Sequence, residues 1–321
     1  RRGKMGIIAS NLSFFLSSLI YLVSFYLGCV IFVYSEKKDR QAIVASVSFL
    51  SCTLFFVGHL LILGKGIPFI LSFSSKILYP SFLILSLLPF AWSYIVFRFY
   101  EDKTIWNRFS LRTIFLFVEF LFFILSFSLV VYLIPRGANI RVSDIIFLLT
   151  DEVFFVFSIY IIFCTLSSIF YLSQVRGKDN NLEEIAKSSA YQTILRASLL
   201  LASLAILVGL VVGLGKNSIE DEIRHISSEN FPPLLLTLDA LACLTIFITI
   251  LIVGQAVISY QVFTGRYLAM KSLKSYWKYI LLFGILYSVV ATLGGLFGYT
   301  SDSKQILLSL LGLIFLVKIQ T

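Results

Sequence analysis

The feature that most constrains this chain is a series of nine separate apolar stretches, which fill it almost from end to end. A hydrocarbon core about 30 Å thick needs about 20 helical residues to cross it, and each stretch is close to that length. We therefore predict an all-α fold, a polytopic transmembrane helix bundle. The spans are expected at residues 7–34, 41–63, 77–99, 113–134, 145–173, 191–214, 234–261, 279–298 and 304–320.

Composition supports the same class. Hydrophobic residues make up 59% of the 321-residue chain and charged residues 13%, whereas about 25% of the residues in a soluble domain are charged. The four cysteines, Cys29, Cys52, Cys164 and Cys243, all lie inside apolar stretches. That position excludes a disulfide framework and a zinc knuckle.

The predicted orientation rests on the basic residues of the loops. One alternating set of loops carries 14 Lys and Arg, whereas the other set carries 7, or 10 with the N-terminal residues included. The positive-inside rule places the richer set in the cytoplasm, with the N-terminus outside and the C-terminus inside. We attribute the net charge of +9 to these loops, so the expected partners are membrane lipids and not nucleic acid.

We expect residues 1–321 to form a single transmembrane domain of a longer protein. The chain opens on Arg1 and Arg2 with no initiator Met, and it ends directly after an apolar stretch. The first stretch lacks a small-residue cleavage site and is long enough to span, so we predict no cleavable signal peptide. A cytoplasmic output domain is expected after residue 321. Whether the short last span crosses fully is left open.

Ionisable residues inside the spans are the candidate functional residues, because each costs about 3 kcal/mol or more in hydrocarbon. We predict that His59, Asp151, Glu152 and Asp239 share the outer third of the membrane and line a ligand-binding pocket there. A small cationic molecule, a metal ion or protons would suit such a pocket. The alternative is that each carboxylate bonds to a hydroxyl or reaches the outer surface. A metal site is not predicted, because the residues lack a ligand spacing such as His-x-x-x-His.

Two further charges are predicted near the cytoplasmic side. Glu119 and Arg196 have opposite sign and similar depth, so we expect an interhelical ion pair, since an unpaired charge in lipid is costly. Such a pair is either structural or a switch that breaks when helices move. The sequence contains no phosphate-binding loop, no His-Glu-x-x-His and no nucleophile elbow. No catalytic residue and no cofactor is therefore predicted in this segment.

The end of the seventh span carries a short motif. Residues Gly254–Arg266 read Gly-Gln-Ala-Val-Ile-Ser-Tyr-Gln-Val-Phe-Thr-Gly-Arg and lead into a basic loop. This motif resembles the multi-spanning N-terminal sensor region of bacterial sensor histidine kinases that contain GAF or PAS modules. In those proteins an acid stands at the position of Gln261 and a lysine at that of Arg266. The Leu-Pro-Arg that follows there is replaced here, so the resemblance covers thirteen residues.

The resemblance implies a sensory or receptor domain in the bacterial inner membrane. Such a domain relays a signal to a cytoplasmic histidine kinase of a two-component system, and the protein forms a homodimer through its output domain. We expect Gln255, Gln261, Gly265 and Arg266 to form the coupling loop. Their amides can bond to neighbouring helices, the glycine can cap the span, and the cation suits the helix dipole and lipid phosphates.

Two other functions compete with the sensor. A proton- or cation-coupled secondary transporter would also use intramembrane carboxylates and proline-bent helices, although nine spans do not divide into the repeated halves that are typical of transporters. A purely structural subunit of a larger membrane complex is the third alternative.

Overall fold

The computed structural model describes residues 2–34, 40–65, 83–84, 86–97, 109–133, 154–175, 191–211, 233–260 and 270–297, and all of them are helical. The labelled helices are α1 (Arg2–Tyr34), α2 (Arg40–Lys65), α4 (Phe109–Leu133), α6 (Phe154–Val175), α8 (Pro233–Tyr260) and α9 (Met270–Phe297). Two further helices cover Ser86–Phe97 and Tyr191–Val211. No described residue lies in a β-strand.

Five helices are long and apolar enough to cross a membrane. Their spanning segments are Gly6–Val33, Arg40–Gly64, Val156–Ser173, Tyr191–Val211 and Leu234–Val257. Shorter apolar helices lie at Ser86–Phe97, Thr113–Ser128 and Trp277–Leu293. These findings confirm the all-α class and indicate an integral membrane protein. The ninth predicted span lies outside the described residues, so the count of nine and the orientation of the termini remain predictions.

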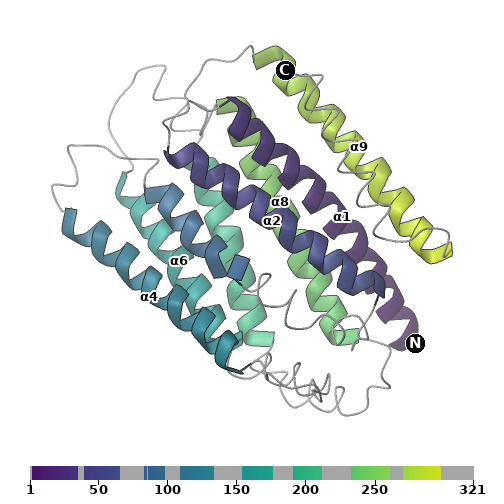
Figure 1. Ribbon diagram of the computed structural model, residues 1–321, viewed down its shortest axis with the longest axis horizontal. Coiled ribbons are helices and arrows are strands. Elements are labelled where there is room, and N and C mark those ends of the chain that lie inside the picture. The colour runs from purple at the N-terminus through teal and green to yellow at the C-terminus, as the bar shows by residue number, and fades with distance from the viewer. Residues whose placement is uncertain are drawn as a thin grey trace.

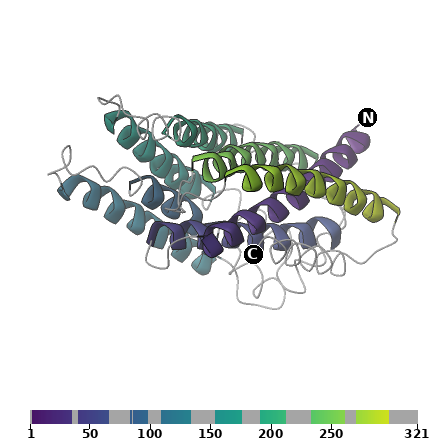
Figure 2. The ribbon, with the colours of Figure 1, turned by 90° about the horizontal axis from the view of Figure 1, so that it is seen from above.

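The helix α1 lies at the centre of one part of the bundle, where it contacts α2, α8 and α9 (Figure 1). Four consecutive side chains of α1, Ile20, Tyr21, Leu22 and Val23, are fully buried. Since consecutive helical residues point about 100° apart, α1 must be covered on every side. Seen from above, the violet helix α1 runs obliquely across the bundle, from the level of the blue helices to its N-terminal end at the level of the green ones (Figure 2).

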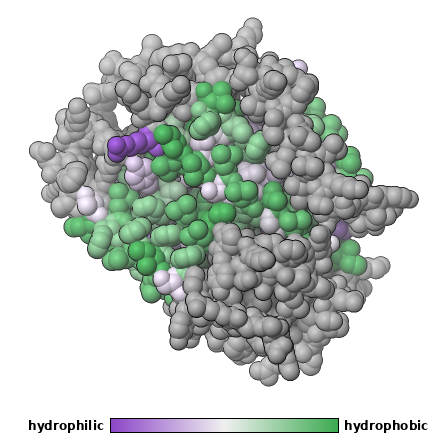
Figure 3. Space-filling view, in the orientation of Figure 1, coloured by the Kyte–Doolittle hydropathy of each residue, from purple (hydrophilic) through white to green (hydrophobic). Residues whose placement is uncertain are grey.

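The helix α9 shows how the outer helices are built. Its buried positions are three or four residues apart, a spacing that forms one stripe along a helix. The stripe consists of Trp277, Ile280, Gly284, Ser288 and Ala291. The opposite face exposes large apolar side chains, among them Leu286 and Val290. Such a face suits lipid, and the side shown in Figure 3 is mostly apolar over the described residues.

Glycines allow the central helices to approach closely. A Cβ at Gly254 of α8 would lie 2.6 Å from Cη2 of Trp277 on α9 and 3.1 Å from Leu27 of α1. A Cβ at Gly28 of α1 would lie 2.9 Å from Cγ of Leu50 on α2. The packing of α1 against its neighbours therefore depends on small residues, which is typical of helix contacts in membranes.

Candidate functional site

A polar cluster joins α1, α2 and α8 inside the apolar bundle. The Nε2 atom of His59 on α2 lies 3.0 Å from Oδ1 of Asp239 on α8, and this is the only ion pair among the described residues. On its other side, Nδ1 of His59 lies 2.9 Å from the Ser17 hydroxyl of α1. The same hydroxyl lies 3.5 Å from Sγ of Cys243. One imidazole thus connects three helices that are distant in sequence.

The cluster is not fully satisfied by the described residues. The Oδ2 atom of Asp239 and the Ser13 hydroxyl are buried and have no hydrogen-bond partner there. Unpaired polar atoms are costly in an apolar surrounding. The side chains of His59 and Asp239 are 18% and 29% exposed, so the cluster is not sealed from its surroundings. It can therefore accept a further proton or ion.

The spacing of the residues explains why the cluster forms. Asp239 and Cys243 are four residues apart on α8, and Ser13 and Ser17 are four apart on α1. Residues four apart lie on the same face of a helix, so each helix presents one polar pair. His59 lies near the end of α2 and Asp239 near the start of α8, which places both at the same end of the bundle.

The structure brings together two of the four predicted pocket residues, His59 and Asp239. Asp151 and Glu152 lie outside the described residues. Ser17 and Cys243 were not predicted. The four-residue spacing of Asp239 and Cys243 was the signal that could have found the cysteine, because it places a carboxylate and a thiol on one face of the same span.

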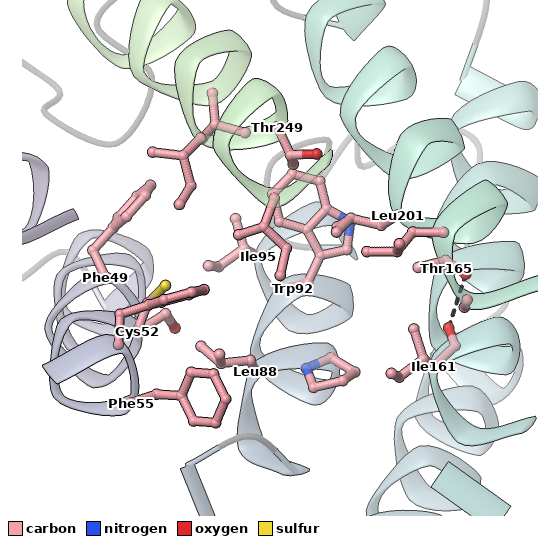
Figure 4. A pocket seen from close by; sticks show the side chains of 18 of the residues that line it. Phe49, Cys52, Phe55, Leu88, Trp92, Ile95, Ile161, Thr165, Leu201 and Thr249 are labelled. Atoms are coloured by element: carbon pink, nitrogen blue, oxygen red, sulfur yellow. Dashed lines mark hydrogen bonds between the residues drawn. The ribbon is translucent and has the colours of Figure 1, made fainter. Parts of the chain in front are cut away.

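A cavity of about 280 Å³ lies beside this cluster. It is enclosed by α2, α6, α8 and the helices Ser86–Phe97 and Tyr191–Val211, and it is partly open. Figure 4 shows side chains from these helices facing the space between them. The wall is mostly apolar and aromatic, with Phe49, Phe55, Phe56, Trp92 and Phe157 among its residues.

Most polar groups of the cavity wall are already bonded within the protein. The Trp92 indole donates to the Ser198 hydroxyl at 3.0 Å. The hydroxyls of Ser48, Thr165 and Thr249 donate to carbonyls of their own helices at 2.7–2.9 Å. These groups therefore offer little to a polar ligand, and the cavity is suited to an uncharged, apolar molecule.

Two phenylalanines connect the cavity to the polar cluster. Phe55 and Phe56 line the cavity. The Phe55 ring stacks on the His59 imidazole with centroids 6.1 Å apart, and the Phe56 ring meets it edge-on at 5.8 Å. A molecule that moves either ring would therefore change the packing around His59.

The predicted ion pair between Glu119 and Arg196 is wrong. Glu119 is fully buried, and its Oε1 accepts a hydrogen bond from the Ser167 hydroxyl of α6. Arg196 is exposed on the helix Tyr191–Val211, and no ion pair joins the two among the described residues. A serine hydroxyl satisfies one oxygen of the buried carboxyl without the cost of burying a second charge.

A group of serines surrounds Glu119. The Ser93 hydroxyl donates to the Cys164 carbonyl at 2.9 Å, and the Ser168 hydroxyl lies 3.3 Å from that of Ser93. The Oε2 atom of Glu119 is buried and has no hydrogen-bond partner in the described part of the chain. This is a second buried acidic group, separate from His59 and Asp239.

The predicted coupling loop is described only at its start. Gln255 lies exposed near the end of α8, two residues after the cavity residue Val253. Gln261, Gly265 and Arg266 lie outside the described residues, so their proposed role stays a prediction.

Comparisons with known protein families, characterised proteins and solved structures find no match to this chain.

Proposed function

We propose that this chain is a membrane-embedded receptor domain that detects a small, uncharged, apolar molecule. The observation that carries the proposal is the cavity of about 280 Å³ between five helices. Its volume is close to the lower end of the range for small-molecule sites, about 300–1,000 Å³. Aromatic walls whose polar groups are already hydrogen-bonded select against charged ligands, because a charge placed there would lose its hydration without gaining a partner.

A receptor also needs a route from the cavity to the rest of the protein. The helix α8 supplies one, because Ile246, Thr249, Ile250 and Val253 line the cavity and the same helix carries Asp239 of the polar cluster. It also packs against α1 and α9. In the proposed mechanism, occupancy of the cavity shifts the population between two packings of α8, and residues 261–266 carry the change onward to a cytoplasmic signalling enzyme, for which a histidine kinase is the first candidate.

Filling the cavity tests its role as the binding site. Ala205 is buried in the cavity wall, so Ala205→Phe places a ring in the space where the ligand would lie. Ile206, the next residue, is 44% exposed, and Ile206→Phe is the matched control. We expect native mass spectrometry of protein from its own membranes to find a bound apolar molecule in the parent and in I206F, and to lose it in A205F.

Signalling is tested in the full-length protein. With the molecule identified, its addition should change the activity of the cytoplasmic enzyme in the parent and in I206F, whereas A205F should hold one level at every concentration. A response in A205F equal to that of the parent, with folding intact by circular dichroism, would contradict the proposal.

A second candidate is a proton- or cation-coupled transporter. The observation that favours it is the pair of buried acidic sites, at Asp239 and at Glu119, each with one carboxyl oxygen that has no partner among the described residues. Transport assays in proteoliposomes distinguish the transporter from the receptor. Proton uptake that follows a substrate gradient and disappears in E119Q would favour transport, whereas its absence together with ligand-dependent output would favour the receptor.

A further inference from the structure

We propose that His59, Asp239 and Cys243 form a binding site for a divalent transition-metal ion with the preferences of Zn²⁺. Nothing in the proposed receptor function requires this site. It rests on the geometry of the three side chains and on the kinds of atom that they offer.

The three side chains offer the kinds of donor atom that Zn²⁺ prefers. One imidazole nitrogen, one carboxylate oxygen and one sulfur lie within 4.8 Å of one another. Nitrogen, oxygen and sulfur from His, Asp and Cys are the usual ligands of Zn²⁺, at about 2.0–2.3 Å from the ion. Ligand atoms in such a tetrahedron are about 3.3–3.8 Å apart. The imidazole nitrogen and the carboxylate oxygen are already 3.0 Å apart, so it is mainly the sulfur that needs to approach, by up to roughly 1 Å. Hard cations such as Mg²⁺ prefer oxygen and are disfavoured by the thiol.

The surroundings orient the histidine for this role. Ser17 lies 2.9 Å from Nδ1 of His59, so the proton can reside on Nδ1 and point to the serine oxygen. The Nε2 atom, which faces Asp239, then presents its lone pair to the metal. A metal-bound histidine almost always donates its second nitrogen in this way, and the partner fixes the orientation of the ring.

A second observation indicates that the cluster is incomplete as it stands. The Oδ2 atom of Asp239 is buried and has no hydrogen-bond partner among the described residues. A metal would satisfy this carboxylate. On binding, the thiol of Cys243 releases its proton to solvent and becomes the thiolate ligand. The three side chains leave one position of a tetrahedron for water or another small ligand.

The partial exposure of the site gives a metal ion access to it. The side chains of His59 and Asp239 are 18% and 29% exposed, whereas the Cys243 residue is only 2% exposed. An ion can therefore meet the imidazole and the carboxylate first and reach the sulfur as the side chains close around it.

Co²⁺ is the probe for the test, because it takes tetrahedral sites of the same ligands and absorbs light. The reduced full chain in lipid nanodiscs is titrated with Co²⁺ under anaerobic conditions. We expect a near-ultraviolet thiolate-to-cobalt band and strong visible bands, both of which Zn²⁺ should abolish by displacement. Cys243→Ser should remove the near-ultraviolet band. Cys52→Ser is the matched control, because Cys52 is also buried and also bonded to a serine, and it should leave both bands unchanged.

Two further variants keep the proposal testable if C243S folds poorly. Ser17→Ala leaves all three ligands in place and should weaken Co²⁺ binding about 10–100-fold, as expected for loss of a partner that orients a ligand. His59→Asn should remove tetrahedral binding. Absence of any thiolate band in the parent, or a band that persists in C243S and disappears in C52S, would overturn the site. Neither result bears on whether an apolar molecule binds in the cavity of the parent and is lost in A205F.

Discussion

The Phe55 ring lies stacked on the His59 imidazole, with centroids 6.1 Å apart and the ring planes inclined by only 15°. The Phe55 side chain also lines the cavity. This single aromatic residue therefore contacts both the apolar space and the polar cluster. The contact between Phe55 and His59 is therefore a direct route between the two, beside the edge-on contact of Phe56 with the same imidazole.

Xenon tests this route, because it occupies apolar cavities without forming hydrogen bonds. The chain has only two histidines, His59 and His225, so ¹⁵N-histidine labelling with His225→Asn isolates the His59 signals. Xenon pressure should shift the ring nitrogen resonances of His59 in the parent. Phe55→Leu keeps the wall apolar but removes the stacked ring, so the shift should fall by at least half.

Phe157→Leu is the matched control for that experiment. Phe157 lines the same cavity from α6, but its ring packs against Tyr160, with centroids 6.2 Å apart. The xenon-induced shift of His59 should therefore persist in F157L. An equal loss in both variants would indicate that the wall as a whole, and not the stacked ring, transmits the change.

The close packing of α8 against α9 predicts that an alanine at Gly254 destabilises the fold far more than an alanine at Gly209. A Cβ at Gly254 would lie 2.6 Å from the rigid Trp277 ring, whereas a Cβ at Gly209 would meet Ser158 no closer than 3.6 Å. Gly254→Ala should destabilise the fold by about 1–3 kcal/mol, as overpacking does. Gly209→Ala should be neutral or stabilising by up to about 1 kcal/mol. Unfolding in mixed micelles measures both, and equal effects would contradict the packing described here.

The surroundings of Glu119 predict that it does not interact with Arg196. Glu119→Ala should cost about 1–3 kcal/mol, because it removes a buried hydrogen bond to Ser167. Arg196→Ala should change stability by less than about 0.5 kcal/mol, since Arg196 is exposed. In the double variant the two effects should add to within about 0.5 kcal/mol, and a larger coupling energy would restore the ion pair.

The sequence predicts the class of fold well because the length of an apolar helix is set by the thickness of the bilayer. Helices lie at eight of the nine predicted ranges, and the end of α8 at Tyr260 is one residue from the prediction. The start of α6 at Phe154 is nine residues later than the predicted start of its span at 145, and residues 145–153 lie outside the described part.

The sites were harder to predict because hydropathy gives depth but not rotation about the helix axis. Depth alone placed His59 with Asp239, and these two do meet. Depth alone also paired Glu119 with Arg196, which face different surroundings. The cavity was not predicted at all, because an empty space between apolar side chains has the same composition as a packed one.

A buried tyrosine that bonds to the backbone of a neighbouring helix provides the last prediction. Ser86 begins the helix Ser86–Phe97, and a buried polar group without a partner costs several kcal/mol in a membrane interior. The Tyr160 hydroxyl of α6 donates to the Ser86 carbonyl of this helix at 2.8 Å. Tyr160→Phe should therefore destabilise the fold by about 0.5–1.5 kcal/mol. Tyr279→Phe is the control, since Tyr279 is 65% exposed and should change the midpoint of thermal unfolding little. Equal midpoints for Y160F and the parent would show that this hydrogen bond does not stabilise the proline-containing helix.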